Sequence, residues 1–116
     1  MPKTVYVIIF SVWGHIKTLA EQVVLGLKES GVHAVLYQVQ ETLPQEVLDK
    51  MYAQKFDIPI ITAADLPKAD GYLFGIPTRY GMAPAQVKAF FDSTGGLWAK
   101  GELAGKYAGI FTSCAS

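Results

Sequence analysis

Cysteine is nearly absent from this chain of 116 residues, which has only Cys114. A single thiol cannot close an intrachain disulfide, and this count agrees with a reducing compartment. The two histidines, His15 and His33, have no second cysteine to form a recognisable zinc-ligand set. The sequence therefore predicts neither a disulfide framework nor a metal site.

An excess of charge of either sign is also missing, because ten basic residues balance ten acidic ones. Non-specific binding of nucleic acids depends on a basic surface, so no nucleic-acid partner is expected. No apolar run approaches the roughly 20 residues that span a bilayer. The first ten residues also lack the long apolar region and cleavage site of a signal peptide. We expect a cytoplasmic protein without a transmembrane segment, and peripheral association with membranes stays open.

Apolar residues are abundant, at 51% of the chain, which is enough for one buried core in a single domain of residues 1–116. Four apolar runs rich in β-branched and aromatic residues predict buried strands at residues 4–10, 33–39, 71–76 and 107–113. Helical spacing predicts helices at residues 16–31, 42–52 and 83–96. The second is entered through Thr42 with Pro44 in its first turn, and the third ends at Gly95 and Gly96.

Strands and helices alternate along the chain, which predicts an α/β fold with a doubly wound parallel sheet and helices on both faces. Residues 54–70 are predicted as a loop with one helical turn, long enough to cover a site or a partner subunit. The fourth strand is the last one in the sequence. We therefore expect an exposed sheet edge and unburied apolar surface beside it.

Ligands of open parallel sheets bind beyond the carboxyl ends of the strands, so the loops after the strands are the candidate site. The residues after the first strand are Ser11, Val12, Trp13, Gly14, His15 and Ile16; those after the third are Pro77, Thr78, Arg79, Tyr80 and Gly81; those after the fourth are Ser113 and Cys114.

The first loop opens a helix, whose free amides and dipole attract an anion such as a phosphate. A plainer alternative is that Ser11 only caps the helix and Gly14 only permits the turn. The glycine pattern of a dinucleotide-binding turn and that of a P-loop are both missing here. A receiver domain is excluded because acidic residues are absent at Phe10-Ser11 and at Ile76-Pro77.

The second loop could lie against a planar ring attached to that phosphate, and a flavin fits this arrangement. Arg79 would favour the reduced, anionic flavin, although an arginine more often pairs with a surface carboxylate. Trp13 and Trp98 could wall a flat substrate or simply pack. Cys114 is predicted as a loop residue near the ligand without a redox role, because no resolving cysteine is present.

Five segments carry a resemblance to a known family: "FSVWGHIKTLA", "ETLP", "LFGIPTRYG", residues 92–106 and "GIFTS". Together they resemble the WrbA family of FMN-dependent NAD(P)H:quinone oxidoreductases, especially its fungal flavodoxin-like members, over essentially the whole chain. The resemblance implies a flavodoxin-like fold with strand order 2-1-3-4-5, non-covalent FMN, and homodimers or homotetramers with sites at subunit contacts.

The resemblance also implies residue roles. Residues 11–16 would hold the FMN phosphate, with Trp13 also lining the nicotinamide pocket where the family usually has tyrosine. Thr78, Arg79 and Tyr80 would contact the isoalloxazine, residues from Ser113 onward the ribityl chain and ring, and Trp98 the quinone.

This sequence also departs from the family pattern in several places. Met82 stands where the family generally has asparagine, and residues 114–116 replace a threonine- and glycine-rich loop. The fifth strand, the last helices and a later histidine near the flavin have no counterpart in this chain, so the domain is predicted to be incomplete at its C-terminal end.

The leading hypothesis is an NAD(P)H dehydrogenase (quinone) that works by two-electron, ping-pong hydride transfer through FMN, with Arg79 tuning the flavin. One alternative is a one-electron flavodoxin carrier, which the balanced charge disfavours, since such carriers present an acidic face. Another is a shortened, non-catalytic relative that acts in assembly or regulation.

Overall fold

The computed structural model describes residues 3–53, 55–78 and 81–113. Four parallel strands form one sheet in the order β2-β1-β3-β4: β1 (Thr4–Ile9), β2 (His33–Gln38), β3 (Gly71–Gly75) and β4 (Tyr107–Phe111). The predicted parallel sheet is confirmed, with the first four strands in the flavodoxin-like order. Each strand ends one or two residues earlier than predicted, because the apolar runs continue into the loops.

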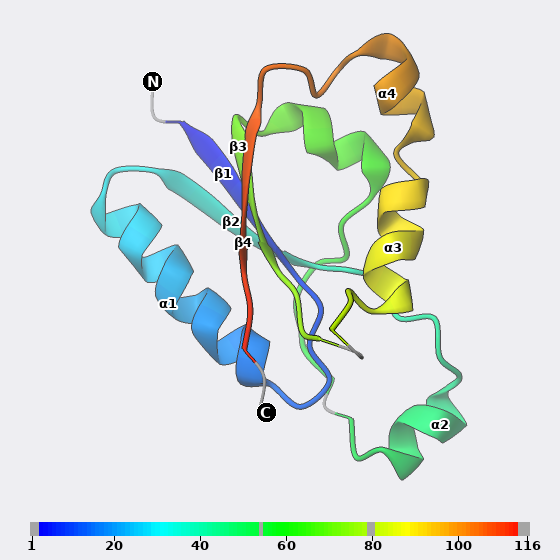
Figure 1. Cartoon of the computed structure of the whole chain (residues 1–116). Helices are drawn as coiled ribbons and strands as arrows, with labels where there is room; N and C mark the ends of the chain where they lie inside the picture. Colours follow the sequence, from blue (N-terminus) through cyan, green and yellow to red (C-terminus); the bar gives the residue numbers. More distant parts are fainter. Residues whose placement is uncertain (1–2, 54, 79–80, 114–116) are drawn as a thin grey trace.

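Helices cover both faces of the sheet, as predicted (Figure 1). Helix α1 (His15–Glu29) lies on one face, while the 3₁₀ helix η1 (Ala63–Lys68) and α3 (Ala85–Asp92) lie on the other. Two shorter helices, α2 (Gln45–Lys50) and α4 (Gly95–Lys100), lie beyond the ends of the sheet. These elements follow one another along the chain as a doubly wound α/β domain.

Successive side chains of β1 point to opposite faces of the sheet, so the core has two layers. Val7 and Ile9 pack with Ile16 and Ala20 of α1. Tyr6, Ile8 and their neighbours pack on the other face. Their buried partners include Leu66 of η1 and Val87 and Phe90 of α3. Because β1 is an inner strand whose last four residues are buried, its carboxyl end is a firm base for the loop that follows.

Two predicted helix boundaries were wrong. Helix α2 begins at Gln45 rather than at Thr42, because Pro44 has the extended conformation of an N-cap residue, and the residue before a proline is disfavoured in a helix. Gly95 and Gly96 begin α4 instead of ending α3, since the amides of Leu97 and Trp98 both donate to the carbonyl of Thr94.

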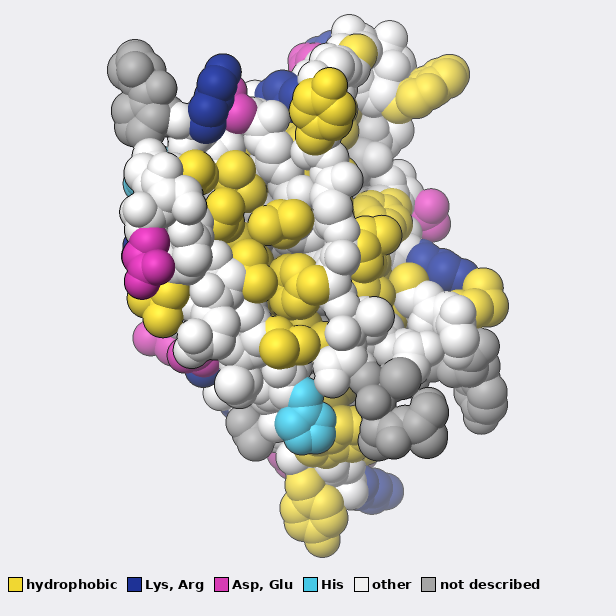
Figure 2. All heavy atoms as spheres, turned by 60° about the vertical axis from the view of Figure 1, so that its left-hand side comes forward, with side chains coloured by type: hydrophobic (Ala, Val, Ile, Leu, Met, Phe, Trp, Pro, Cys, Tyr) yellow, Lys and Arg dark blue, Asp and Glu magenta, His cyan; other side chains and the backbone are white. Residues whose placement is uncertain are grey.

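The exposed sheet edge is confirmed at β4. No strand among the described residues pairs with its outer side, and Tyr107 and Ile110 are 88% and 72% exposed. Figure 2 shows apolar side chains open to solvent on this side of the molecule. Tyr107 lies on the sheet face that carries α1 and Ile110 on the opposite face, so apolar surface is uncovered on both sides of β4.

Candidate functional site

The carboxyl ends of three strands meet at one edge of the sheet. The amide of Phe10 donates to the carbonyl of Gly75 at 3.2 Å, and the amide of Ile76 donates to that of Phe111 at 3.1 Å. The hydroxyl of Thr112 donates to the carbonyl of Ile76. The segments after β1, β3 and β4 therefore lie side by side, as the candidate site requires.

The loop after β1 is closed by a hydrogen bond within itself. The amide of Gly14 donates to Ser11 Oγ at 3.1 Å, and Gly14 is the N-cap residue of α1 with φ 97°. Ser11 therefore shapes the loop but does not cap the first turn of the helix. Only glycine adopts this backbone conformation without strain, which explains why the turn after β1 contains a glycine at residue 14.

The start of α1 presents amides without acceptors. In the described part of the chain, the backbone N–H groups of His15, Ile16 and Lys17 donate to no group, and the first turn has no acidic residue. The Lys17 ammonium is engaged at 2.7 Å by Glu21. The positive end of the helix dipole is thus open to an anion.

Close packing at Gly75 holds this helix start near the sheet. A Cβ atom at Gly75 would lie 2.6 Å from Phe111 Cζ and 2.9 Å from Ile16 Cγ2. Ile16 is itself buried, so α1 can approach β3 this closely only because residue 75 has no side chain. Sequence patterns gave no sign of this role.

Two predicted contacts of the first loop are qualified by the structure. The side chain of Val12 is buried in the core, which leaves its backbone as the part that can meet a ligand. Trp13 is 45% exposed, and its indole N–H donates to the carbonyl of Met51 at 2.8 Å. This bond ties the loop to the end of α2. A role for Trp13 beside the nicotinamide stays a prediction.

A shallow hollow of about 280 Å³ lies where the planar ring was predicted. Its lining residues are Ile76, Pro77, Thr78, Gly81, Met82, Ala83, Ile110 and Thr112. Ser113 is exposed next to it in sequence. The predicted site residues Arg79, Tyr80 and Cys114 lie outside the described residues.

Trp98 is not brought to this edge. It lies on α4, at the end of the sheet opposite the three loops (Figure 1), and is 86% exposed. Within one chain it therefore does not reach the hollow or the start of α1.

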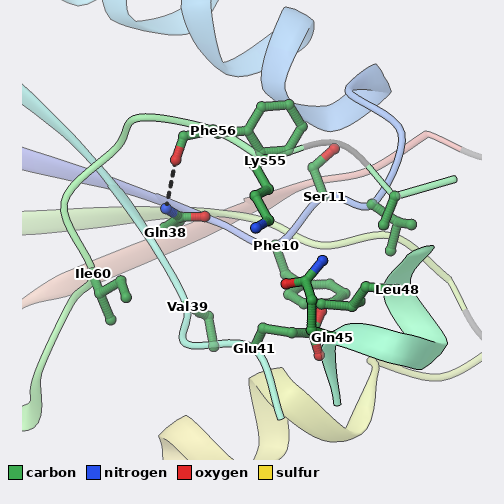
Figure 3. Close-up of a pocket in the computed structure, with 12 residues that line it drawn as sticks. Phe10, Ser11, Gln38, Val39, Glu41, Gln45, Leu48, Lys55, Phe56 and Ile60 are labelled. Carbon is green, nitrogen blue, oxygen red and sulfur yellow. Dashed lines mark hydrogen bonds between the residues drawn. The ribbon is translucent and has the colours of Figure 1, made fainter. Parts of the chain in front are cut away.

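A second cavity, which we call the α2 pocket, adjoins the first loop (Figure 3). Its volume is about 280 Å³. Its lining residues are Phe10, Ser11, Val12, Gln38, Val39, Glu41, Gln45, Leu48, Ala53, Lys55, Phe56 and Ile60. The side-chain amide of Gln38 donates to the carbonyls of Phe56 and Ile58, and Gln38, the last residue of β2, forms an isolated parallel bridge with Ile60. The predicted loop thus covers a cavity, which the sequence analysis had not located.

The side chains with shifted pKa values lie outside the three loops. Burial raises the pKa values of the Tyr6 and Tyr72 hydroxyls. Hydrogen bonds from the Thr62 side chain and backbone lower the pKa of the Asp65 carboxyl. Within the described ranges no cluster of three potential metal ligands occurs, and no helix there is long and apolar enough to cross a membrane.

Comparison with known proteins agrees with this geometry. The family described as NADPH-dependent FMN reductase matches residues 6–116. The chain is 55% identical over 109 residues to "NAD(P)H quinone oxidoreductase YCP4" of Candida albicans, covering 92% of this chain and 38% of that protein. It is 51% identical over 116 residues to "Minor allergen Alt a 7" of Alternaria alternata, covering 97% of this chain and 57% of that protein.

A solved structure is also similar. The WrbA-like flavodoxin of Agrobacterium tumefaciens superposes with a TM-score of 0.71 at 27% identity, covering 98% of this chain and 61% of that one. The resemblance to the WrbA family and the flavodoxin-like fold are thereby confirmed. The chain spans about half the length of the curated relatives that it matches. With the match extending over nearly all of its residues, the chain belongs to the NADPH-dependent FMN reductase family.

Proposed function

We propose that the protein binds FMN and takes part in the two-electron reduction of quinones by NAD(P)H. The observation that carries the proposal is the open start of α1. Its three unpaired amides lie at the same edge of the sheet as the hollow that Pro77 and Thr78 line. Family membership and the quinone oxidoreductase names of relatives support it. Because those relatives are about twice as long, the activity of the whole protein is part of the proposal.

The residues present fit FMN at both ends. A phosphate dianion suits the amides of residues 15–17, with Ser11 and Gly14 holding the loop in place. The hollow beside Thr78 suits a planar ring. When bound, FMN supplies a ring that accepts hydride from NAD(P)H and passes the electrons to a quinone. The protein positions and shields the reactants, and we assign Arg79 to stabilising the reduced flavin and Tyr80, Ser113 and Cys114 to flavin contact.

The quinone site requires a second copy of the chain in this proposal. Trp98 lies too far from the loops of its own chain (Figure 1), so it can line the quinone pocket only from a partner in a homodimer or homotetramer. Trp13 would form the wall on the nicotinamide side. The single cysteine supports the cytoplasm as the compartment.

Flavin binding tests the proposal directly. FMN is titrated into flavin-free protein and the quenching of flavin fluorescence is followed. Gly14→Ala is expected to weaken FMN binding about tenfold, because an L-residue at positive φ costs roughly 1–2 kcal/mol and displaces the loop. Gly31→Ala is the matched control, since Gly31 has φ 82° at the other end of the same helix. It should lower stability similarly and leave FMN affinity unchanged.

Turnover separates the proposed function from its alternatives. NADH or NADPH with benzoquinone should give parallel lines in double-reciprocal plots. Arg79→Ala should lower the potential of the bound flavin, and an unchanged potential would remove the role given to Arg79. A stable one-electron-reduced flavin on titration would indicate a flavodoxin-type carrier. Protein that binds no FMN would indicate the non-catalytic alternative.

A further inference from the structure

We propose that the α2 pocket binds the adenosine group of an adenine dinucleotide, beside the phosphate that the start of α1 would hold. This inference rests on the proposed function, because it takes the residue 11–16 loop as a phosphate site. It adds a second subsite and a ligand class, the adenylate.

The α2 pocket lies directly beside the loop that opens α1. Ser11 and Val12 belong both to the loop that opens α1 and to the pocket wall. A group joined to a phosphate at the loop can therefore enter the pocket directly. The pocket lies toward β2, whereas the hollow for the flavin ring lies toward β4. An adenosine and a flavin ring would thus lie on opposite sides of the phosphate.

Hydrogen bonds hold the Glu41 carboxylate in place before any ligand arrives. Its Oε1 atom accepts hydrogen bonds from the amides of Thr42 and Leu43 at 2.8 and 3.0 Å. It also accepts one from Gln86 Nε2 at 2.6 Å, and Gln86 is buried. Across the described residues, Oε2 accepts no hydrogen bond. A fixed carboxylate with one oxygen to spare accepts the hydroxyl hydrogens of a ribose or the amino hydrogens of a purine.

The charges in the wall determine which part of a nucleotide can enter. Glu41 and Lys55 both line the pocket, so the wall has no net positive charge to attract a phosphate, and the pocket suits the uncharged base and ribose while the phosphate stays at α1. Phe10 and Val39 are buried apolar surfaces in the wall, which suits the face of a purine. Figure 3 shows Lys55 and Gln45 converging above Phe10, where their polar ends can reach the edge of a base.

The volume is consistent with one nucleoside. At about 280 Å³ the pocket is slightly smaller than most small-molecule sites, which span about 300–1,000 Å³. It has room for an adenosine group but not for a whole dinucleotide. Two dinucleotides carry this uncharged adenosine: FAD, whose flavin would replace FMN, and the electron donor NADH, whose adenosine would lie next to the phosphate of bound FMN.

Leu48→Trp tests the proposal by filling the pocket, since Leu48 lines it from α2. Val47→Trp is the matched control, because Val47 is the preceding, exposed residue and does not line the pocket. Binding of FMN and of FAD is measured for each protein by flavin fluorescence. Binding of ADP-ribose, the adenylate part of NADH, is measured by calorimetry on FMN-loaded protein.

Leu48→Trp should weaken FAD or ADP-ribose binding about tenfold and FMN binding less than twofold, while Val47→Trp changes none of them. Weaker FAD binding would show that the pocket holds the adenosine of FAD, and weaker ADP-ribose binding would show that it holds the adenosine of the electron donor. Unchanged affinity for both adenylates overturns the proposal, even if FMN binds. If the wild-type protein binds neither FMN nor FAD, the proposed function itself fails, and this inference with it.

Glu41→Gln decides the matter if Leu48→Trp does not fold. The amide oxygen can still accept the hydrogen bonds that Oε1 accepts, but an NH₂ donor replaces the spare oxygen. Adenylate affinity should fall about tenfold, as expected for losing a hydrogen bond to a charged group, and FMN affinity should not change. An unaltered adenylate affinity in Glu41→Gln contradicts the proposal.

Discussion

Gly75 offers the sharpest test of how the fold positions the candidate site. A Cβ atom built there lies 2.6 and 2.7 Å from two ring atoms of Phe111 and 2.9 Å from Ile16 Cγ2. Carbon atoms pack at about 3.5–4.0 Å, so the Gly75→Ala variant has to move its neighbours by roughly 1 Å. The Phe111 ring is half-buried and can turn outward, whereas Ile16 is 2% exposed and is held by the core.

The expected cost follows from two opposing contributions. Overpacking a core costs about 1–3 kcal/mol, and replacing glycine by alanine in a strand recovers about 0.5–1 kcal/mol. Gly75→Ala should therefore lower the free energy of unfolding by about 1–2 kcal/mol. In urea unfolding followed by far-UV circular dichroism, this is a midpoint shift of about 0.5–1 M.

Gly71→Ala is the matched control for this measurement. Gly71 begins the same strand, and a Cβ there would lie 3.4 Å from the carbonyl oxygen of Tyr107 and 3.9 Å from a Val5 methyl group. These contacts are close to ordinary, so Gly71→Ala should keep the gain of about 0.5–1 kcal/mol for alanine in a strand and should not lower the free energy of unfolding. Equal stabilities of the two variants would refute the close approach of α1 to β3.

The binding site should respond as well. Displacing Ile16 moves the first turn of α1, so Gly75→Ala should weaken FMN binding while Gly71→Ala does not. Replacing Phe111 by leucine in the Gly75→Ala background removes the two closest ring atoms and should restore part of the lost stability. If the two substitutions prove additive, the clash with Phe111 is not the cause.

Three further predictions concern other elements. Gly26→Ala should raise the free energy of unfolding by about 0.5–1 kcal/mol in urea titrations, because Gly26 lies within α1, near its C-terminal end, and a Cβ there meets nothing within 4 Å. Trp13→Phe should lower it by about 1 kcal/mol and weaken FMN binding, since it removes the bond to the Met51 carbonyl; unchanged FMN affinity would show that the loop does not need this tie. Asp65→Ala should cost about 1 kcal/mol at neutral pH, because Asp65 completes the capping box of η1 with Thr62. The pKa of Asp65 is lowered in the folded protein, so its stabilisation is present above the unfolded-state pKa and is lost as the pH falls through the folded-state value. The difference in unfolding free energy between the two proteins should therefore begin to shrink below about pH 4. It should disappear only once the pH is below the lowered folded-state pKa of Asp65, and a difference that does not shrink in acid would contradict this reasoning.

The predicted strands and the main helix depended on local signals that survive folding. The run of residues 4–10 is apolar on both faces, and only a strand covered on both faces buries it. Residues 16–27 repeat apolar side chains at helical spacing, and Gly31, with φ 82°, follows the end of α1. Family motifs in the loops then indicated the site. Errors arose where two local preferences compete, as at Pro44 and at Gly95, because neighbouring residues decide which preference prevails.

Local pattern was therefore enough for the α/β class, the strand sequence and the loops that carry the candidate site. Packing between distant residues decided the rest. The need for glycine at residue 75 arises only where β3, Phe111 and Ile16 meet, and the fixed orientation of Glu41 depends on Gln86, 45 residues away. The position of Trp98 at the far end of the sheet likewise depends on where α4 packs. Contacts of this kind join segments that are far apart in sequence, so no window of neighbouring residues contains them.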